Sequence, residues 1–146
     1  MQSAAVVGMG ATPLVRLSYG LRFAPVEVGL RLQVEHQSMR TVDTVADTTV
    51  VGLGASLGTE WALRRLDLRA WASFDEQWWR QQVQKQGVRT ALVPVVGVGG
   101  GVRLPIVDPL FASAAVEALL HLPQVEGRGT VARPGVRGAL GLGVSF

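Results

Sequence analysis

The stretch VVGLGASLGTEWALRR, residues 50–65, carries Gly52, Gly54 and Gly58 in a G-x-G-x-x-x-G spacing after a short apolar run. Such glycines bring a backbone close to a pyrophosphate when a helix begins among them and the preceding strand is buried on both faces. Here only residues 59–65 follow before a new period-two alternation starts. The three glycines also share one parity, opposite a row of apolar residues. The pattern therefore predicts one face of a long strand rather than a nucleotide loop.

The two histidines are the other candidates for chemistry. A histidine base works with a nucleophile and an acid held beside it. His36 lies on the apolar parity at the end of a predicted strand, which indicates a rim position, and His121 shares its parity with Glu117. No serine-containing motif stands beside either histidine. We therefore expect no catalytic site, no enzyme activity and no cofactor, and two histidines without cysteine do not predict a metal site.

The composition leaves two classes of protein open. The 146 residues suffice for one domain, residues 1–146, and 48% of them are hydrophobic. The longest charge-free stretches, residues 1–15 and 90–102, are both interrupted by a proline and fall short of the roughly 18 apolar residues of a membrane-spanning helix. The chain is thus predicted to be either a dense soluble core or a membrane protein built from strands.

The charged residues indicate the environment of the chain but do not indicate a ligand. The net charge is +3, the sequence pI is about 10.5, and Lys85 is the only lysine among 14 basic residues. Arginine suits crowded, paired environments, whereas lysine suits a solvated surface. No basic cluster with interleaved aromatics is present, so we expect no nucleic-acid partner. The start, MQSAAVVGMG, lacks a basic segment, so no signal peptide is predicted; an exported form would be a mature chain or a fragment with an added Met.

Period two, not 3.6, dominates the chain. From Val26 to Glu35 one parity is aliphatic and the other is charged, polar or glycine. Pro94 interrupts one segment and indicates an edge or a bulge, and residues 112–122 are also compatible with a short helix. Short turns are expected near Pro25 and at 63–65 and 105–109, and longer polar loops at 39–47, 80–87 and 123–134. The eight predicted antiparallel strands are residues 4–9, 15–23, 26–35, 49–61, 66–73, 89–104, 112–122 and 136–146.

Alternation alone does not say which face is outside. A soluble barrel directs its apolar side chains inward, and a membrane barrel directs them outward. Small residues mixed with long charged ones on the polar parity favour a cramped interior, and strands of about ten residues match a tilted crossing of a bilayer. Aromatic residues near strand ends are typical of interface girdles. The expected girdle residues are Tyr19, Phe23, Trp61, Phe74, Trp78, Trp79 and Phe146.

The C-terminal GALGLGVSF, with alternating Leu140, Leu142 and Val144 before Phe146, resembles the closing strand of bacterial outer-membrane β-barrel proteins. The alternation of short turns and long loops extends the likeness to the whole chain. It looks like the small eight-stranded class, similar in architecture to the transmembrane domain of OmpA. The resemblance implies an all-β, antiparallel up-and-down transmembrane barrel in the bacterial outer membrane. It also implies that the barrel assembly machinery reads the last strand.

A barrel of eight strands is just wide enough for its own side chains to fill. Buried charges must be paired, so we expect an Arg-carboxylate network across the lumen. We therefore expect a structural or anchoring barrel, standing alone or as the C-terminal module of a longer protein, with the bilayer and other envelope proteins as partners. A small pore or transport component, and a soluble barrel binding an apolar ligand, are the alternatives. The expected lumen residues are Arg16, Arg22, Glu27, Arg31, Glu35, Glu60, Asp67, Arg69, Arg103, Glu117 and Arg137.

Overall fold

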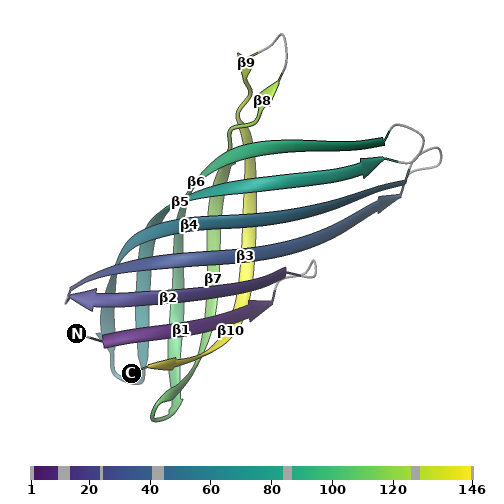
Figure 1. Ribbon diagram of the computed structural model, residues 1–146. Helices are drawn as coiled ribbons and strands as arrows, with labels where there is room; N and C mark the ends of the chain where they lie inside the picture. Colours follow the sequence, from purple (N-terminus) through teal and green to yellow (C-terminus); the bar gives the residue numbers. More distant parts are fainter. Residues whose placement is uncertain are drawn as a thin grey trace.

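The computed structural model describes residues 2–9, 14–23, 25–40, 45–83, 87–125 and 129–145. They form a closed antiparallel barrel of eight strands and a separate two-stranded hairpin, β8-β9 (Figure 1). Among these residues, no helix is long and apolar enough to cross a membrane. The strands are β1 Gln2–Met9, β2 Leu14–Phe23, β3 Val26–Arg40, β4 Val45–Leu63, β5 Leu66–Val83, β6 Gly87–Val107, β7 Leu110–His121, β8 Gln124–Val125, β9 Gly129–Thr130 and β10 Arg133–Ser145.

The first and last strands close the barrel. Pairing between β1 and β10 runs from Ala4 opposite Ser145 to Met9 opposite Leu140. Closure gives every barrel strand a neighbour on both sides, which satisfies the backbone where water is absent. Residues 110–121 are a strand and not a helix because their backbone pairs with both β6 and β10. The predicted up-and-down barrel of eight strands is therefore confirmed.

Four strands are longer than the sequence pattern predicts. The loops expected at 39–47 and 80–87 are wrong in large part, because β3 pairs with β4 as far as Arg40 opposite Val45, and β5 pairs with β6 as far as Val83 opposite Gly87. In Figure 1 these ends of β3, β4, β5 and β6 reach well past β1 and β2. In the extended ends of β3, β4 and β5, polar residues occupy both parities of the sequence, so the period-two signal fades although the hydrogen-bonded ladder continues.

Pro94 lies where the pairing of β6 with β7 ends, which agrees with the predicted edge position. The last pair at this end is Val95 opposite His121, and Pro94 is the next residue of β6 beyond it. The carbonyl of Pro94 accepts a hydrogen bond from the backbone N–H of Leu122 at 2.9 Å. Since a strand residue directs its N–H and C=O to the same side, the missing N–H of Pro94 falls where the ladder ends. The register irregularity lies instead between Pro105 and Val107.

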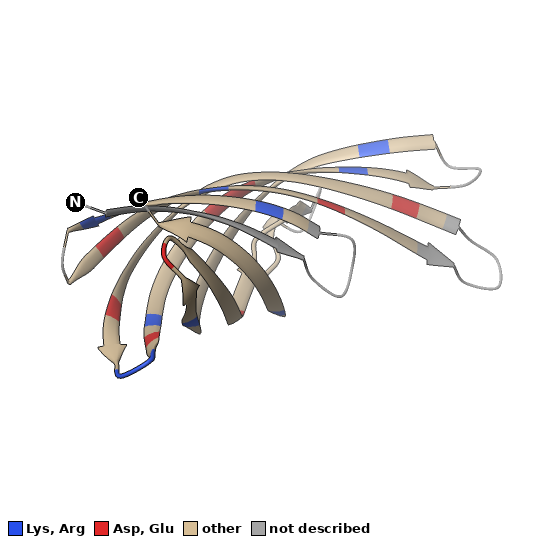
Figure 2. Ribbon diagram, turned by 90° about the horizontal axis from the view of Figure 1, so that it is seen from below, with Lys and Arg blue, Asp and Glu red and all other residues tan. Residues whose placement is uncertain are grey.

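The two faces of the barrel wall differ sharply in chemistry. Large aliphatic side chains point outward, and Leu53, Leu140 and Val136 are 64%, 70% and 79% exposed. Buried positions are mostly polar, and they include Arg31, Glu60, Asp75, Gln77, Arg103 and Glu117. Acidic and basic positions are distributed along the strands (Figure 2). The interior is therefore charged, and an apolar ligand cavity inside a soluble barrel does not fit this arrangement.

Candidate functional site: the charged lumen

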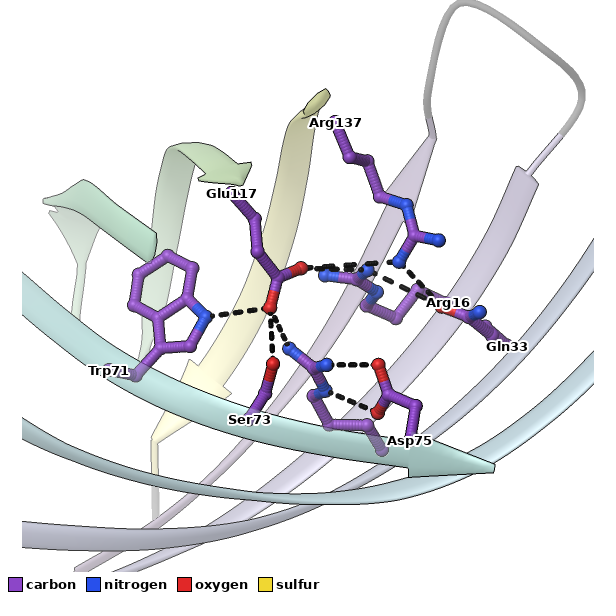
Figure 3. A network of polar contacts seen from close by, with 8 residues as sticks. Arg16, Gln33, Trp71, Ser73, Asp75, Glu117 and Arg137 are labelled. Atoms are coloured by element: carbon purple, nitrogen blue, oxygen red, sulfur yellow. Dashed lines mark hydrogen bonds and ion pairs between the residues drawn. The ribbon is translucent and has the colours of Figure 1, made fainter. Parts of the chain in front are cut away.

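The middle of the lumen holds a cluster built around Glu117 of β7, here called the central cluster (Figure 3). The Glu117 carboxylate is 2% exposed and accepts hydrogen bonds from Arg31 Nη1 at 2.6 Å, Ser73 Oγ at 2.8 Å and Trp71 Nε1 at 3.1 Å. A buried carboxylate needs such donors because it has lost its water shell. The complete cluster comprises Arg16, Arg31, Gln33, Trp71, Ser73, Asp75, Glu117 and Arg137.

One guanidinium joins opposite walls of the barrel. Arg31 lies on β3, four strands from β7 in either direction around the closed sheet. It forms a two-pronged ion pair with Asp75 through Nε and Nη2, and a second ion pair with Glu117. Such bidentate arginine pairs combine strong attraction with fixed geometry. Arg31 therefore ties β3, β5 and β7 together through the centre of the lumen.

A second cluster lies beside the short turns, and we call it the turn-side cluster. Glu60 accepts a hydrogen bond from Arg22 Nη1 at 2.7 Å, and its other oxygen lies 3.3 Å from Arg103 Nη1 and 3.4 Å from Arg69 Nε. Arg69 also pairs with Glu27. The Arg103 guanidinium stacks 4.3 Å from the centre of the Phe111 ring. Within the described residues, no ion pair joins this cluster to the central one.

The glycines of the opening stretch make these contacts possible. Gly54 stands between Arg31 and Asp75 in one cross-strand row. A Cβ at Gly54 would overlap the Asp75 carboxylate and lie 2.6 Å from the Phe74 carbonyl oxygen. A Cβ at Gly52 would meet the Gln33 side chain at 2.8 Å, and one at Gly58 would meet the Ala70 carbonyl oxygen at 2.6 Å. These glycines leave space between strands for lumen side chains.

A small apolar cluster lies at the loop end of the lumen. Val93, Val95 and Leu119 are nearly or completely buried, and Trp79 packs against them. Trp79 Nε1 donates to Gln77 Oε1 at 2.9 Å, and its ring meets the His121 ring edge-to-face. The expectation that Trp79 belongs to a membrane-interface girdle is therefore wrong, because this side chain shares the inward face with Asp75 and Gln77.

The other expected girdle residues divide by position. Phe23 ends β2 and Trp61 lies near the end of β4, both beside short turns and both more than half exposed. Trp78 is half exposed toward the loop end of β5. Tyr19 and Phe74 are exposed but lie mid-strand, not at strand ends. Phe146 lies outside the described residues.

All eleven expected lumen residues lie on the inward face of their strands. Nine of them form the ion pairs described above. Glu35 and Asp67 make no ion pair within the described residues. Asp75 was not among the predicted lumen residues, because the predicted strand stopped at Ser73, and Gln33, Trp71 and Ser73 were not predicted as partners. Extending the parity of Ser73 to residues 75 and 77 would have found both Asp75 and Gln77.

Within the described residues, each histidine has one hydrogen-bond contact, and neither contact is to an acidic side chain. His36 is exposed, and its Nδ1 lies 3.2 Å from Thr49 Oγ1. His121 Nδ1 lies 3.4 Å from the Arg133 carbonyl oxygen. Glu117 is four residues from His121 along β7, which corresponds to about 13 Å in a strand. In the described part of the chain, no group of three histidine or acidic residues is placed to hold a metal ion.

Comparisons with known proteins find likeness in structure only. No family model matches the chain, and no curated protein matches it. Among solved structures it is similar to Neisserial surface protein A (14% identity, 99% of this chain, 92% of that chain, TM-score 0.67). It is also similar to Ail, the attachment invasion locus protein of Yersinia pestis (11% identity, 99% of this chain, 94% of that chain, TM-score 0.59). A third similar structure is the outer membrane enzyme PagL (13% identity, 99% of this chain, 99% of that chain, TM-score 0.53).

These likenesses agree with the topology and the outward aliphatic face. The chain has the fold of the small eight-stranded bacterial outer-membrane β-barrels, with the surface of a barrel embedded in lipid. One of the similar structures is an enzyme, so the fold by itself does not decide whether the protein is catalytic.

Proposed function

We propose that this protein is a non-catalytic, non-conducting anchor of the bacterial outer membrane, whose barrel presents the extended ends of β3, β4, β5 and β6 outside the bilayer. The observation that carries the proposal is the Arg31 contact with Glu117, which spans the lumen between opposite strands. The apolar cluster around Val93 and Trp79 adds a second obstruction at the loop end. Two different obstructions in series support a filled lumen over an open one.

In a membrane barrel, the residues of the inward face and those of the lipid-facing surface have different roles. The eleven predicted lumen residues, together with Asp75, act as a polar plug that holds the barrel in shape, and Phe23, Trp61 and Trp78 anchor it at the two lipid-water interfaces. Residues 1–146 act as one barrel domain. Strand β10 is the segment that the barrel assembly machinery reads, and the loop-end extensions contact other envelope proteins.

Conductance across a planar lipid bilayer tests the anchor directly. The refolded protein is expected to give no discrete conductance steps, with heat-dependent gel mobility of unboiled samples as the control for folding. Arg31→Gln and Arg69→Gln provide matched variants from the two clusters. Discrete steps in the unaltered protein that change in size in both variants would refute the anchor.

A small pore is the second candidate, and one observation favours it. A cavity of about 100 Å³ lies in the lumen, lined by residues of both charged clusters. Such a chamber is what a narrow conduit closed by ion pairs would contain. The same conductance measurement separates the two functions, since only a pore has a conductance that changes with the charge of Arg31 and Arg69.

A further inference from the structure

The cavity between the two charged clusters has an unusual lining. It is bordered by Arg16 and Arg31 of the central cluster and by Glu27, Arg69 and Arg103 of the turn-side cluster. Its volume of about 100 Å³ exceeds what one water molecule needs. The remaining wall is made largely of small residues, among them Ser18, Ser56 and Ser113.

The charges around this cavity do not balance. The ion pairs of the described lumen join six arginines to only four carboxylates, those of Glu27, Glu60, Asp75 and Glu117. Glu35, beyond the central cluster on β3, and Asp67, the cross-strand neighbour of Arg103 on β5, do not line the cavity and make no ion pair within the described residues. Uncompensated buried charge is strongly destabilising. The lining of the cavity itself therefore carries four guanidinium groups against the single carboxylate of Glu27.

Two of the bordering arginines also have unused donors. The Nε atoms of Arg16 and Arg103 are buried and have no hydrogen-bond partner among the described residues. Arg103 is 8% exposed, so bulk water does not replace the missing partner. Within the described residues, its one ion pair is the 3.3 Å contact with Glu60, an acid that it shares with Arg22 and Arg69. Buried donors of this kind indicate a missing acceptor.

We propose that this cavity binds a small inorganic anion of the chloride class. The anion compensates the arginine excess, accepts hydrogen bonds from guanidinium groups and serine hydroxyls, and links the two clusters into one plug. Large organic anions such as gluconate do not fit a chamber of about 100 Å³. The site does not depend on whether the lumen conducts, because the charge excess is the same in an anchor and in a pore.

Urea unfolding at constant ionic strength tests the site, with chloride compared against gluconate, which is too large for the cavity. A ligand bound by the folded state alone raises stability with its concentration. We expect chloride at ten times its Kd to raise the unfolding midpoint by on the order of 0.5 M urea. Equal midpoints in the two salts would overturn the proposal.

Ser113 provides a matched pair of variants. It lines the cavity and is the cross-strand neighbour of Arg103. Ser113→Asp supplies a built-in negative charge, so the chloride dependence should disappear, whereas the similar but neutral Ser113→Asn should keep it. Chloride dependence that survives in Ser113→Asp would contradict the assignment. If this variant fails to fold, bromide-soaked crystals of the unaltered protein decide the matter: an anomalous peak in the cavity supports the site, and bromide found elsewhere or not at all overturns it.

Discussion

At the scale of single residues, Glu117 is the side chain on which the central cluster depends. It joins Arg31, Ser73 and Trp71 from two other strands, and removing its charge leaves buried guanidinium groups short of a partner. Breaking a buried pair from one side costs roughly 3–5 kcal/mol. We therefore expect Glu117→Gln to lower the free energy of unfolding by about 3 kcal/mol, measured by urea titration in detergent micelles or lipid vesicles.

Glu35→Gln is the control for this change. Glu35 also lies on an inward face, but it makes no ion pair within the described residues. We expect its replacement to change stability by less than about 1 kcal/mol. Equal losses in the two variants would mean that total lumen charge, and not the Glu117 contacts, determines stability.

At the scale of strands, the contacts across β4 depend on the absence of a side chain at Gly54. Arg31 and Asp75 meet over this residue, and an added methyl group would press on both Asp75 and the Phe74 carbonyl oxygen. Overpacking of this kind costs roughly 1–3 kcal/mol. Gly54→Ala should therefore lower the urea midpoint, while Gly138→Ala on β10, where a Cβ meets nothing within 4 Å, should leave it nearly unchanged. A similar loss at both positions would indicate a general cost of replacing strand glycines.

At the scale of the whole molecule, the membrane is expected to cover only part of the barrel wall. Leu140 lies on the outward face of β10, and Val88 lies on the part of β6 that extends past β7. An arginine facing lipid near the bilayer midplane costs roughly 2–4 kcal/mol, and one outside the bilayer costs little. In vesicles we expect Leu140→Arg to lose about that amount and Val88→Arg to lose less than about 1 kcal/mol. A large loss for Val88→Arg would show that the extended strands are immersed in lipid.

Strand type, parity and topology were predictable from the sequence because successive side chains of a strand point to opposite faces, a property of the local backbone. The aliphatic and charged rows of β2 and β3 therefore appear directly in the residue order. Strand ends were less predictable. In β5 beyond Ser73, polar residues occupy both parities of the sequence, so residues 74–83 carry no clear alternation, although the structure buries Asp75 and Gln77 and exposes Phe74 and Trp78. For this reason Asp75 was missed and Trp79 was assigned to the wrong face.

By itself, the sequence determined that the chain forms a barrel of alternating strands with charged residues on the inward face. Only the tertiary structure decided which of those charges meet, because Arg31 and Glu117 are 86 residues apart in the chain and come together through closure and stagger of the sheet. The same closure separates the arginines into two clusters and leaves the cavity between them. Residue order specifies faces, and only three-dimensional closure specifies partners across a lumen.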